Sequence, residues 1–127
     1  MSKSSLRTTQ LTNALSRLDE VLEQPKNSFM RDSAIQRFEF TADLAWKVLQ
    51  GVLEEKFGVK ANAPKTAARL AHENGLVSDL PAWLSMIDDR NLTSHSYDEE
   101  IAAKIYAQLP SYADLVRTLL QALKSSE

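Results

Sequence analysis

The sequence predicts an all-α protein, an antiparallel up-and-down bundle of about five helices in which residues 1–127 form a single domain. Three glycines and four prolines are too few to supply the many turns of an all-β fold. Apolar residues make up 43% of the chain and charged residues 25%, which is typical of a globular protein with one core. Leucine and other apolar residues recur at the spacing of amphipathic helices.

The first two helices are predicted on either side of a proline-containing break. Residues 6–23 carry apolar side chains at helical spacing, namely Leu11, Leu15, Leu18 and Leu22. The second and longest helix is expected over residues 31–57, with Ser28 or Asp32 as its N-terminal cap. Gly58 follows it directly and suits the left-handed conformation that commonly ends a helix.

The predicted second helix carries two apolar stripes. The first stripe comprises Ile35, Phe38, Ala42, Ala45, Leu49 and Val52. The second stripe comprises Phe40, Leu44 and Val48, flanked by Trp46. A surface helix of a monomer usually carries one stripe. Two interpretations stay open: a central helix buried within its own bundle, or a long helix that also forms the interface of a homodimer.

Two shorter helices are predicted next. Pro64 suits the first position of a helix that reaches residue 74, and Gly75 follows it. The loop before that helix, GVKANAPKT, lacks the second glycine and the Gly-Lys-Ser/Thr ending of a phosphate-binding loop. Another helix is expected over residues 79–94, with Pro81 in its first turn.

The last predicted helix begins near Asp98. Asp98 itself can cap it, or Ser96 and Glu99 can form a capping box. Pro110 is expected to kink or break this helix, because proline lacks the backbone N–H of a helical residue. The apolar residues on either side of it again have helical spacing: Ile101, Ile105, Tyr106, Leu109, Leu115, Leu119, Leu120 and Leu123.

Composition limits the class of protein. The formal net charge of −2 argues against nucleic-acid binding through a dominant basic surface, but it leaves room for a small cationic site. The chain has no cysteine, which excludes disulfides, thiolate metal sites and cysteine nucleophiles. The N-terminal residues lack the apolar core of a signal peptide, and no stretch approaches the roughly 20 apolar residues of a membrane span. We therefore expect a soluble, cytoplasmic protein with no membrane partner.

The segment RNLTSHSY, residues 90–97, brings together a cation, an imidazole and a phenol. Arg90 offers a planar fork of donors that suits phosphate oxygens, and His95 titrates near neutral pH and can transfer a proton. Their separation corresponds to roughly 140° on an ideal helix, so the two side chains can meet only where the helix ends. One His supplies a single proton-transfer group, whereas a symmetric dimer supplies two for cleaving RNA through its 2′-hydroxyl.

A purely structural interpretation of the same residues stays open. Arg90 can pair with Asp88, Asp89 or a more distant carboxylate, and His95 can simply occupy a helix C-terminus, where a cation is favoured. Asp88, Asp89 and Glu99 give only a weak metal signal, because adjacent helical residues diverge by about 100°. We therefore expect no metal site.

Other polar residues have ordinary explanations. Asp43 and Lys47 have the spacing of a helical ion pair. His72 lies near another helix end, and we expect it to be structural. Ser94 next to His95 could suggest a serine nucleophile, but the sequence shows no third group or oxyanion hole to support one.

Two stretches, RDSAIQRFEFTADLAWKVLQ and WLSMIDDRNLTSHSYDEE, resemble the HepT-type, nucleotidyltransferase substrate-binding branch of the HEPN superfamily. The resemblance runs over about residues 11–123 and implies a small helical bundle that forms homodimers. Many HEPN proteins are metal-independent ribonucleases that use an Arg and a His of one motif. The resemblance implies that Arg90 and His95 are catalytic, with Asn91 and Ser94 as supporting polar residues.

The resemblance also implies a partner and a means of control. Such proteins resemble toxins neutralised by a cognate minimal nucleotidyltransferase, the antitoxin, which transfers AMP from ATP to the motif tyrosine, here Tyr97. ATP and Mg2+ then belong to that partner, and this chain itself needs no cofactor. The alternative is a non-catalytic substrate-binding subunit of a two-component nucleotidyltransferase. Without the family, Tyr97 is expected to be a partly buried aromatic residue at the helix junction.

Overall fold

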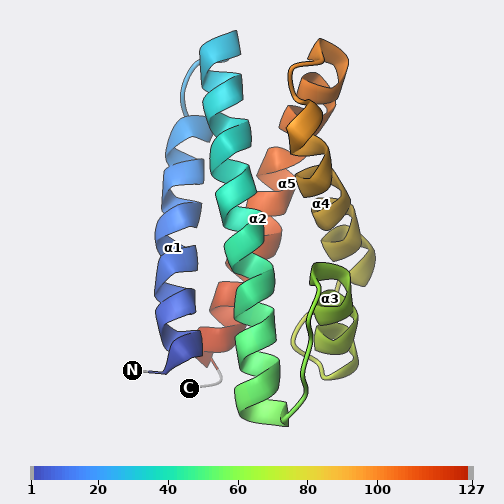
Figure 1. Ribbon diagram of the computed structural model, residues 1–127. Helices are drawn as coiled ribbons and strands as arrows, with labels where there is room; N and C mark the ends of the chain where they lie inside the picture. Colours follow the sequence, from blue (N-terminus) through green and yellow to red (C-terminus); the bar gives the residue numbers. More distant parts are fainter. Residues whose placement is uncertain (1, 126–127) are drawn as a thin grey trace.

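The computed structural model describes residues 2–125, which form five α-helices and one 3-10 turn and contain no β-strand. The elements are α1 (Lys3–Leu22), α2 (Ser28–Phe57), α3 (Pro64–Glu73), α4 (Leu80–Leu92), η1 (Thr93–His95) and α5 (Glu99–Ser125). Figure 1 shows α1 and α2 side by side and antiparallel, with α4 running up the opposite side and α5 returning behind α2. The predicted all-α, up-and-down bundle is confirmed.

Helix α2 is the central element, because it contacts each of the other helices and η1. All members of its first apolar stripe are buried. Val48 of the second stripe is also fully buried, so it belongs to the core, while Leu44 is half-buried and Phe40 is 53% exposed. The interpretation of α2 as a central core helix is therefore confirmed, and Phe40 and Leu44 remain as an apolar strip on its outer surface.

The core joins all five helices around bulky apolar side chains. Burying one such side chain stabilises the fold by roughly 1.5–3 kcal/mol relative to leaving it exposed. None of the helices within residues 2–125 has both the length and the apolar character needed to span a membrane. The largest fully buried apolar side chains are Trp83, Phe38, Leu11, Leu18, Leu49, Leu53, Met86, Ile105 and Leu109.

The ends of α2 are set by a capping residue and a glycine. The N-terminal cap is Asn27, so the prediction of Ser28 or Asp32 is wrong. The Asn27 side-chain oxygen accepts a hydrogen bond from the Met30 backbone N–H at 2.9 Å, which satisfies one of the unpaired donors of the first turn. At the other end, the prediction for Gly58 is confirmed: its φ is +65°, in the left-handed region.

Helix α5 passes through Pro110 without interruption, so the predicted break is wrong. Pro110 is exposed, whereas Leu109 and Ala113 on the same turn are buried in the core. A proline removes one helical hydrogen bond, but core packing on both sides of it holds the two halves of the helix together. Tertiary contacts therefore outweigh the local signal.

Candidate functional site

Helix α4 ends within residues 90–97, here called the motif segment, although no glycine or proline is present to stop it. The Thr93 hydroxyl donates to the Arg90 carbonyl oxygen at 2.7 Å, and the Ser94 hydroxyl donates to the Asn91 carbonyl oxygen at 3.3 Å. These side chains bind carbonyl oxygens that would otherwise accept from the next helical turn. The helix therefore ends at Leu92, earlier than predicted, and the chain continues into η1.

Arg90 is held by Asp43 of α2. Its Nε donates to Asp43 Oδ1 at 2.7 Å and its Nη2 donates to Oδ2 at 2.9 Å, so the pair is bidentate. The partner of Arg90 is thus a distant carboxylate rather than Asp88 or Asp89. The predicted ion pair between Asp43 and Lys47 is wrong, because Arg90 binds both carboxylate oxygens of Asp43.

This contact fixes the position of Arg90 and leaves part of its guanidinium available. Hydrogen bonds to Asp43 raise the pKa of Arg90 above its ordinary value, the charge of Glu39 adds to this effect, and partial burial opposes it. Asp43 uses only the Nε side of a group that has five N–H donors. Within residues 2–125, Arg90 Nη1 has no hydrogen-bond acceptor, and 30% of the side chain is exposed. The free end of the fork can therefore bind a second anion.

His95 and Tyr97 lie together on the surface. Their ring centroids are 6.1 Å apart in an edge-on arrangement. Tyr97 is 82% exposed, so the expectation of a partly buried aromatic residue is wrong. In the part of the chain that the structure describes, no side-chain hydrogen bond is made by either ring, and none joins His95 to Arg90. A single chain therefore places His95 beside Tyr97 but does not connect it to Arg90.

A surface hollow of about 500 Å3 lies between α1 and α2, beside the carboxylate that holds Arg90. Its lining combines two arginines with the apolar strip of α2: Ala14, Arg17, Ser33, Gln36, Arg37, Phe40, Asp43 and Leu44. Phe40 is thus exposed, and Leu44 half-buried, next to Asp43. Exposed apolar side chains that are grouped beside polar residues are typical of a surface that another molecule covers.

A buried polar contact anchors α4 to α5 beneath the motif. The Tyr112 hydroxyl donates to Asp89 Oδ2 and lies 3.1 Å from the Ser85 hydroxyl oxygen. The Tyr112 ring stacks on Phe38 of α2, with ring centroids 5.4 Å apart. Burial, and then the hydrogen bond to Asp89, raise the pKa of Tyr112 to about 12. Because Asp89 directly precedes Arg90, this contact fixes the backbone from which Arg90 projects.

The three carboxylates considered as metal ligands do not converge. Asp88 Oδ1 lies 2.6 Å from Lys65 Nζ, Asp89 accepts from Tyr112, and Glu99 pairs with a residue of α2. Within residues 2–125, no three His, Cys, Asp or Glu side chains are arranged to hold a metal ion. Each of the three carboxylates therefore has a partner of its own, and together they do not form a ligand set.

Comparison with known proteins identifies the family. A family model described as nucleotidyltransferase substrate binding protein like matches residues 6–125. The chain belongs to this HepT-like family. A curated relative, the probable ribonuclease HepT of Haemophilus influenzae, is 35% identical over 95 residues, which make up 72% of this chain. The same residues make up 65% of the relative, so the chain spans less than two thirds of its length.

Two solved structures share the fold. A protein of Thermus thermophilus is 42% identical, with a TM-score of 0.85 over 89% of this chain and 98% of that chain. A tri-AMPylated HEPN toxin of Shewanella oneidensis, in complex with MNT antitoxin, has a TM-score of 0.80 over 98% of this chain and 99% of its own. The toxin is only 12% identical, so this second likeness concerns the fold alone.

Sequence reasoning missed three residues of α2 that contact the motif segment or the helix after it. Asp43 binds Arg90, and Arg31 binds the first residue of α5. Glu39 Oε2 lies 3.2 Å from the Thr93 hydroxyl oxygen, whose single proton it shares with the closer Arg90 carbonyl oxygen. Glu39 and Asp43 are one helical turn apart and therefore share a face. That acidic pair was the only local signal that α2 faces a cation.

Proposed function

We propose that this chain is the toxin of a HepT/MNT-type toxin–antitoxin pair, a metal-independent endoribonuclease that acts as a homodimer. Arg90 and His95 cleave RNA, and a cognate minimal nucleotidyltransferase silences the enzyme by adding AMP to Tyr97. One observation carries the proposal: Asp43 holds the Arg90 guanidinium in place with its Nη1 end free, and His95 and Tyr97 are exposed in the same segment. The curated relative, a probable ribonuclease, supports it.

The proposed reaction uses the internal nucleophile of RNA. One His95 takes the proton of the 2′-hydroxyl, and the 2′-oxygen attacks the adjacent phosphorus. His95 of the second copy donates a proton to the departing 5′-oxygen. Arg90 binds a non-bridging phosphate oxygen and stabilises the charge of the transition state. The products are a 2′,3′-cyclic phosphate and a 5′-hydroxyl, and no metal ion takes part.

A homodimer supplies the second imidazole that a single chain lacks. One copy of the motif has one imidazole, and that imidazole is not hydrogen-bonded to Arg90. Phe40 is exposed and Leu44 is half-buried beside Asp43, so a second copy placed there buries apolar surface and brings two motifs together. Light scattering tests the dimer: Phe40→Glu should give a monomer. The control is Phe57→Glu, which changes a side chain that is 43% exposed near the end of α2, and this variant should remain a dimer. A wild-type monomer at micromolar concentration would exclude the composite site.

AMP on Tyr97 blocks the site by size and by charge. The Tyr97 oxygen attacks the α-phosphorus of ATP, pyrophosphate leaves, and a base of the transferase takes the phenolic proton. Because the two rings are 6.1 Å apart, the attached nucleotide occupies the space beside His95. Its phosphodiester adds negative charge where an RNA phosphate must bind. In this scheme ATP and Mg2+ are held by the transferase, and this chain supplies only the acceptor hydroxyl.

Cleavage of RNA in excess EDTA tests the nuclease directly. Wild-type protein should produce 2′,3′-cyclic phosphate ends, and His95→Ala should not. His72→Ala is the matched control, because His72 is the other histidine and is also exposed on the last turn of a helix. Equal cleavage by wild type and His95→Ala, with intact mass showing unmodified protein, would refute the assignment of His95.

Labelled ATP tests the control step. Incubation with the cognate transferase should label wild-type protein and Tyr106→Phe, but not Tyr97→Phe. The labelled wild type should then cleave RNA more slowly than the unlabelled protein. Label that persists in Tyr97→Phe would show that the acceptor is another residue.

A substrate-binding subunit is the second candidate, and the family description favours it. In that case the bundle holds an acceptor molecule, while the partner holds ATP. The same labelling reaction separates the two functions once cell extract is added. Label transferred to a third molecule, together with no cleavage of RNA by unmodified protein, would favour the binding subunit.

A further inference from the structure

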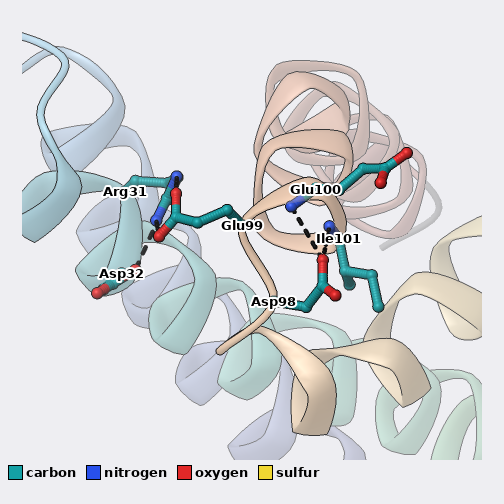
Figure 2. A network of polar contacts seen from close by, with 6 residues as sticks. All are labelled: Arg31, Asp32, Asp98, Glu99, Glu100 and Ile101. Carbon is teal, nitrogen blue, oxygen red and sulfur yellow. Dashed lines mark hydrogen bonds and ion pairs between the residues drawn. The ribbon is translucent and has the colours of Figure 1, made fainter.

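An ion pair joins the start of α2 to the start of α5. Arg31 Nη1 donates to Glu99 Oε2 at 2.8 Å and Nη2 donates to Oε1 at 3.1 Å, so the contact is bidentate (Figure 2). The Arg31 side chain is only 17% exposed, whereas that of Glu99 is 81% exposed. Asp32 adds a longer contact, with its Oδ1 3.6 Å from Arg31 Nε. Glu99 therefore lies against a fixed cation rather than moving freely in solvent.

This pair is one of three contacts that α2 makes with residues before and after His95 and Tyr97 in the chain. The contacts are Asp43–Arg90, Glu39–Thr93 and Arg31–Glu99. The three α2 residues are eight and four positions apart, so their side chains leave the helix within roughly 120° of one another. Two of the contacts precede His95 in the chain, and only the Arg31–Glu99 pair follows Tyr97.

The start of α5 is capped locally, but the cap does not tie it to another helix. Asp98 Oδ1 accepts from the backbone N–H groups of Glu100 at 3.0 Å and Ile101 at 3.1 Å (Figure 2). Asp98 is thus the N-terminal cap, one of the two predicted alternatives. Among the described residues, the Arg31–Glu99 pair is the only side-chain hydrogen bond or ion pair that links residues 96–101 to another helix.

We infer that Arg31 is a positioning residue, which acts through Glu99 to fix the place of His95 and Tyr97. The inference rests on the proposed function for the chemistry of those two side chains. Neither ring makes a side-chain hydrogen bond in the described structure, so its position depends on a backbone held at both ends. Without the pair, the segment is held by polar contacts at one end only, and productive geometry becomes rarer.

The predicted consequence is kinetic. Loss of the pair should lower kcat for AMP transfer to Tyr97 and for RNA cleavage at His95, and leave KM almost unchanged, because fewer molecules have the rings in place at any moment. Lysine should not replace Arg31, because a single ammonium cannot form the same two parallel hydrogen bonds.

Charge alone predicts a different pattern, which makes the inference testable. Arg31→Gln leaves an unpaired carboxylate two residues from Tyr97, which repels ATP and RNA. Glu99→Gln leaves a cation whose remaining ion pair is the longer contact to Asp32, and this cation attracts them. An electrostatic role therefore gives effects of opposite sign in the two variants, whereas a positioning role makes both slower. The exchanged pair, Arg31→Glu with Glu99→Arg, should recover activity if the contact itself matters.

The first measurement is amide hydrogen exchange of residues 96–101, followed by mass spectrometry. We expect exchange to speed up by roughly threefold in both single variants and to return toward wild type in the exchanged pair. The matched control is Arg117→Gln, which removes another ion pair between helices: Arg117 Nη2 binds Asp19 Oδ2 at 2.6 Å, joining the second half of α5 to α1. The control should leave exchange of residues 96–101 unchanged.

The second measurement is the rate of AMP transfer by the cognate transferase, with RNA cleavage alongside it. A fall of roughly threefold or more in kcat for both single variants, but not for Arg117→Gln, supports the inference. Unchanged exchange, or a faster reaction in Glu99→Gln, overturns it. If wild-type protein neither accepts AMP nor cleaves RNA, the proposed function fails, while the exchange data still decide whether the pair fixes the segment.

Discussion

Replacing Tyr112 by Phe removes one hydroxyl and leaves Asp89 buried without its donor. Tyr112 is 5% exposed and Asp89 is 8% exposed, so water cannot readily replace the lost hydrogen bond. A hydrogen bond to a charged group contributes about 1.5–3 kcal/mol, and leaving a buried partner unsatisfied costs a similar amount. We therefore expect Tyr112→Phe to lower the free energy of unfolding by about 2 kcal/mol at pH 8. For a chain of 127 residues this lowers the midpoint of thermal unfolding by about 7 °C.

The same hydroxyl makes stability depend on pH, and its raised pKa gives the sign. The pKa of Tyr112 rises from 10.0 to about 12, because burial and the hydrogen bond to Asp89 disfavour the phenolate. The contribution to stability is complete below pH 10 and is lost as the pH rises toward 12. At pH 11 the wild type should have lost about 1 kcal/mol that Tyr112→Phe cannot lose. The gap between the two proteins should narrow from about 2 to about 1 kcal/mol.

Urea unfolding followed by circular dichroism, at pH 8 and at pH 11, measures both effects. Tyr106→Phe is the control on the same helix: the Tyr106 ring lies 5.6 Å from Lys26 Nζ, and its hydroxyl makes no hydrogen bond within residues 2–125. That variant should unfold like wild type at both pH values. The reasoning would be refuted by a Tyr112→Phe midpoint within about 1 °C of wild type at pH 8, or by a gap that does not narrow at pH 11.

Two further predictions concern single contacts. Gly58→Ala should lower the free energy of unfolding by about 1 kcal/mol, because φ is +65° at this position. Gly58→Asn should lower it by less, since Asn tolerates the left-handed conformation. Equal stability of wild type and both variants in urea would contradict this prediction. Asp43→Asn should lower the free energy of unfolding by about 1 kcal/mol and slow RNA cleavage at least about tenfold, because Arg90 loses its charged bidentate partner. The control is Glu73→Gln, at an exposed position on α3. Undiminished cleavage by Asp43→Asn would argue against the role of Arg90.

The fold class could be predicted because the signals for it are local. Helical spacing of apolar residues, Pro64 and Pro81 in first turns, and the cap at Asp98 all act within a few residues, and the structure has helices at these places. The errors arose where distant packing decides the outcome. Pro110 does not break α5, because the core holds both sides of it. The sequence also left two interpretations of α2 open, and packing decides between them for Val48, which is buried because other helices surround α2.

The residues of the candidate site could be predicted from the sequence, but the distant residues that hold them in place could not. Arg90, His95 and Tyr97 lie within eight consecutive residues, so their spacing alone suggested a site. The residue that holds Arg90 is 47 positions away, and the partner of Glu99 is 68 positions away. A helical rule favours the nearby Lys47 as the partner of Asp43, and only the approach of α4 to α2 reverses that choice.

The irregular apolar pattern of α2 has a physical explanation, because different sides of this helix have different surroundings. Its buried face packs against every other helix. A second face carries Glu39 and Asp43, which hold the motif segment, and Arg31, in the first turn on the buried side of the helix, holds the start of α5. Between these faces, Phe40 and Leu44 remain exposed to some degree. A helix with three occupied faces cannot show one clean apolar stripe, so the irregular pattern itself reflects contacts beyond the core.

The exposed side chains of the motif and the residues that bind between helices should respond differently to mutation, so experiments can separate effects on activity from effects on stability. His95 and Tyr97 are exposed and make no side-chain hydrogen bonds within the described chain, so replacing them should remove chemistry while leaving unfolding almost unchanged. Asp43 and Asp89 bind across helices, so replacing them should reduce stability and activity together. A variant of His95 that both loses activity and unfolds easily would not fit this arrangement, because within the described residues that side chain has no hydrogen bond or ion pair to lose, only its edge-on contact with the exposed Tyr97 ring. Activity lost at His95 without loss of stability is therefore evidence about the reaction rather than the fold.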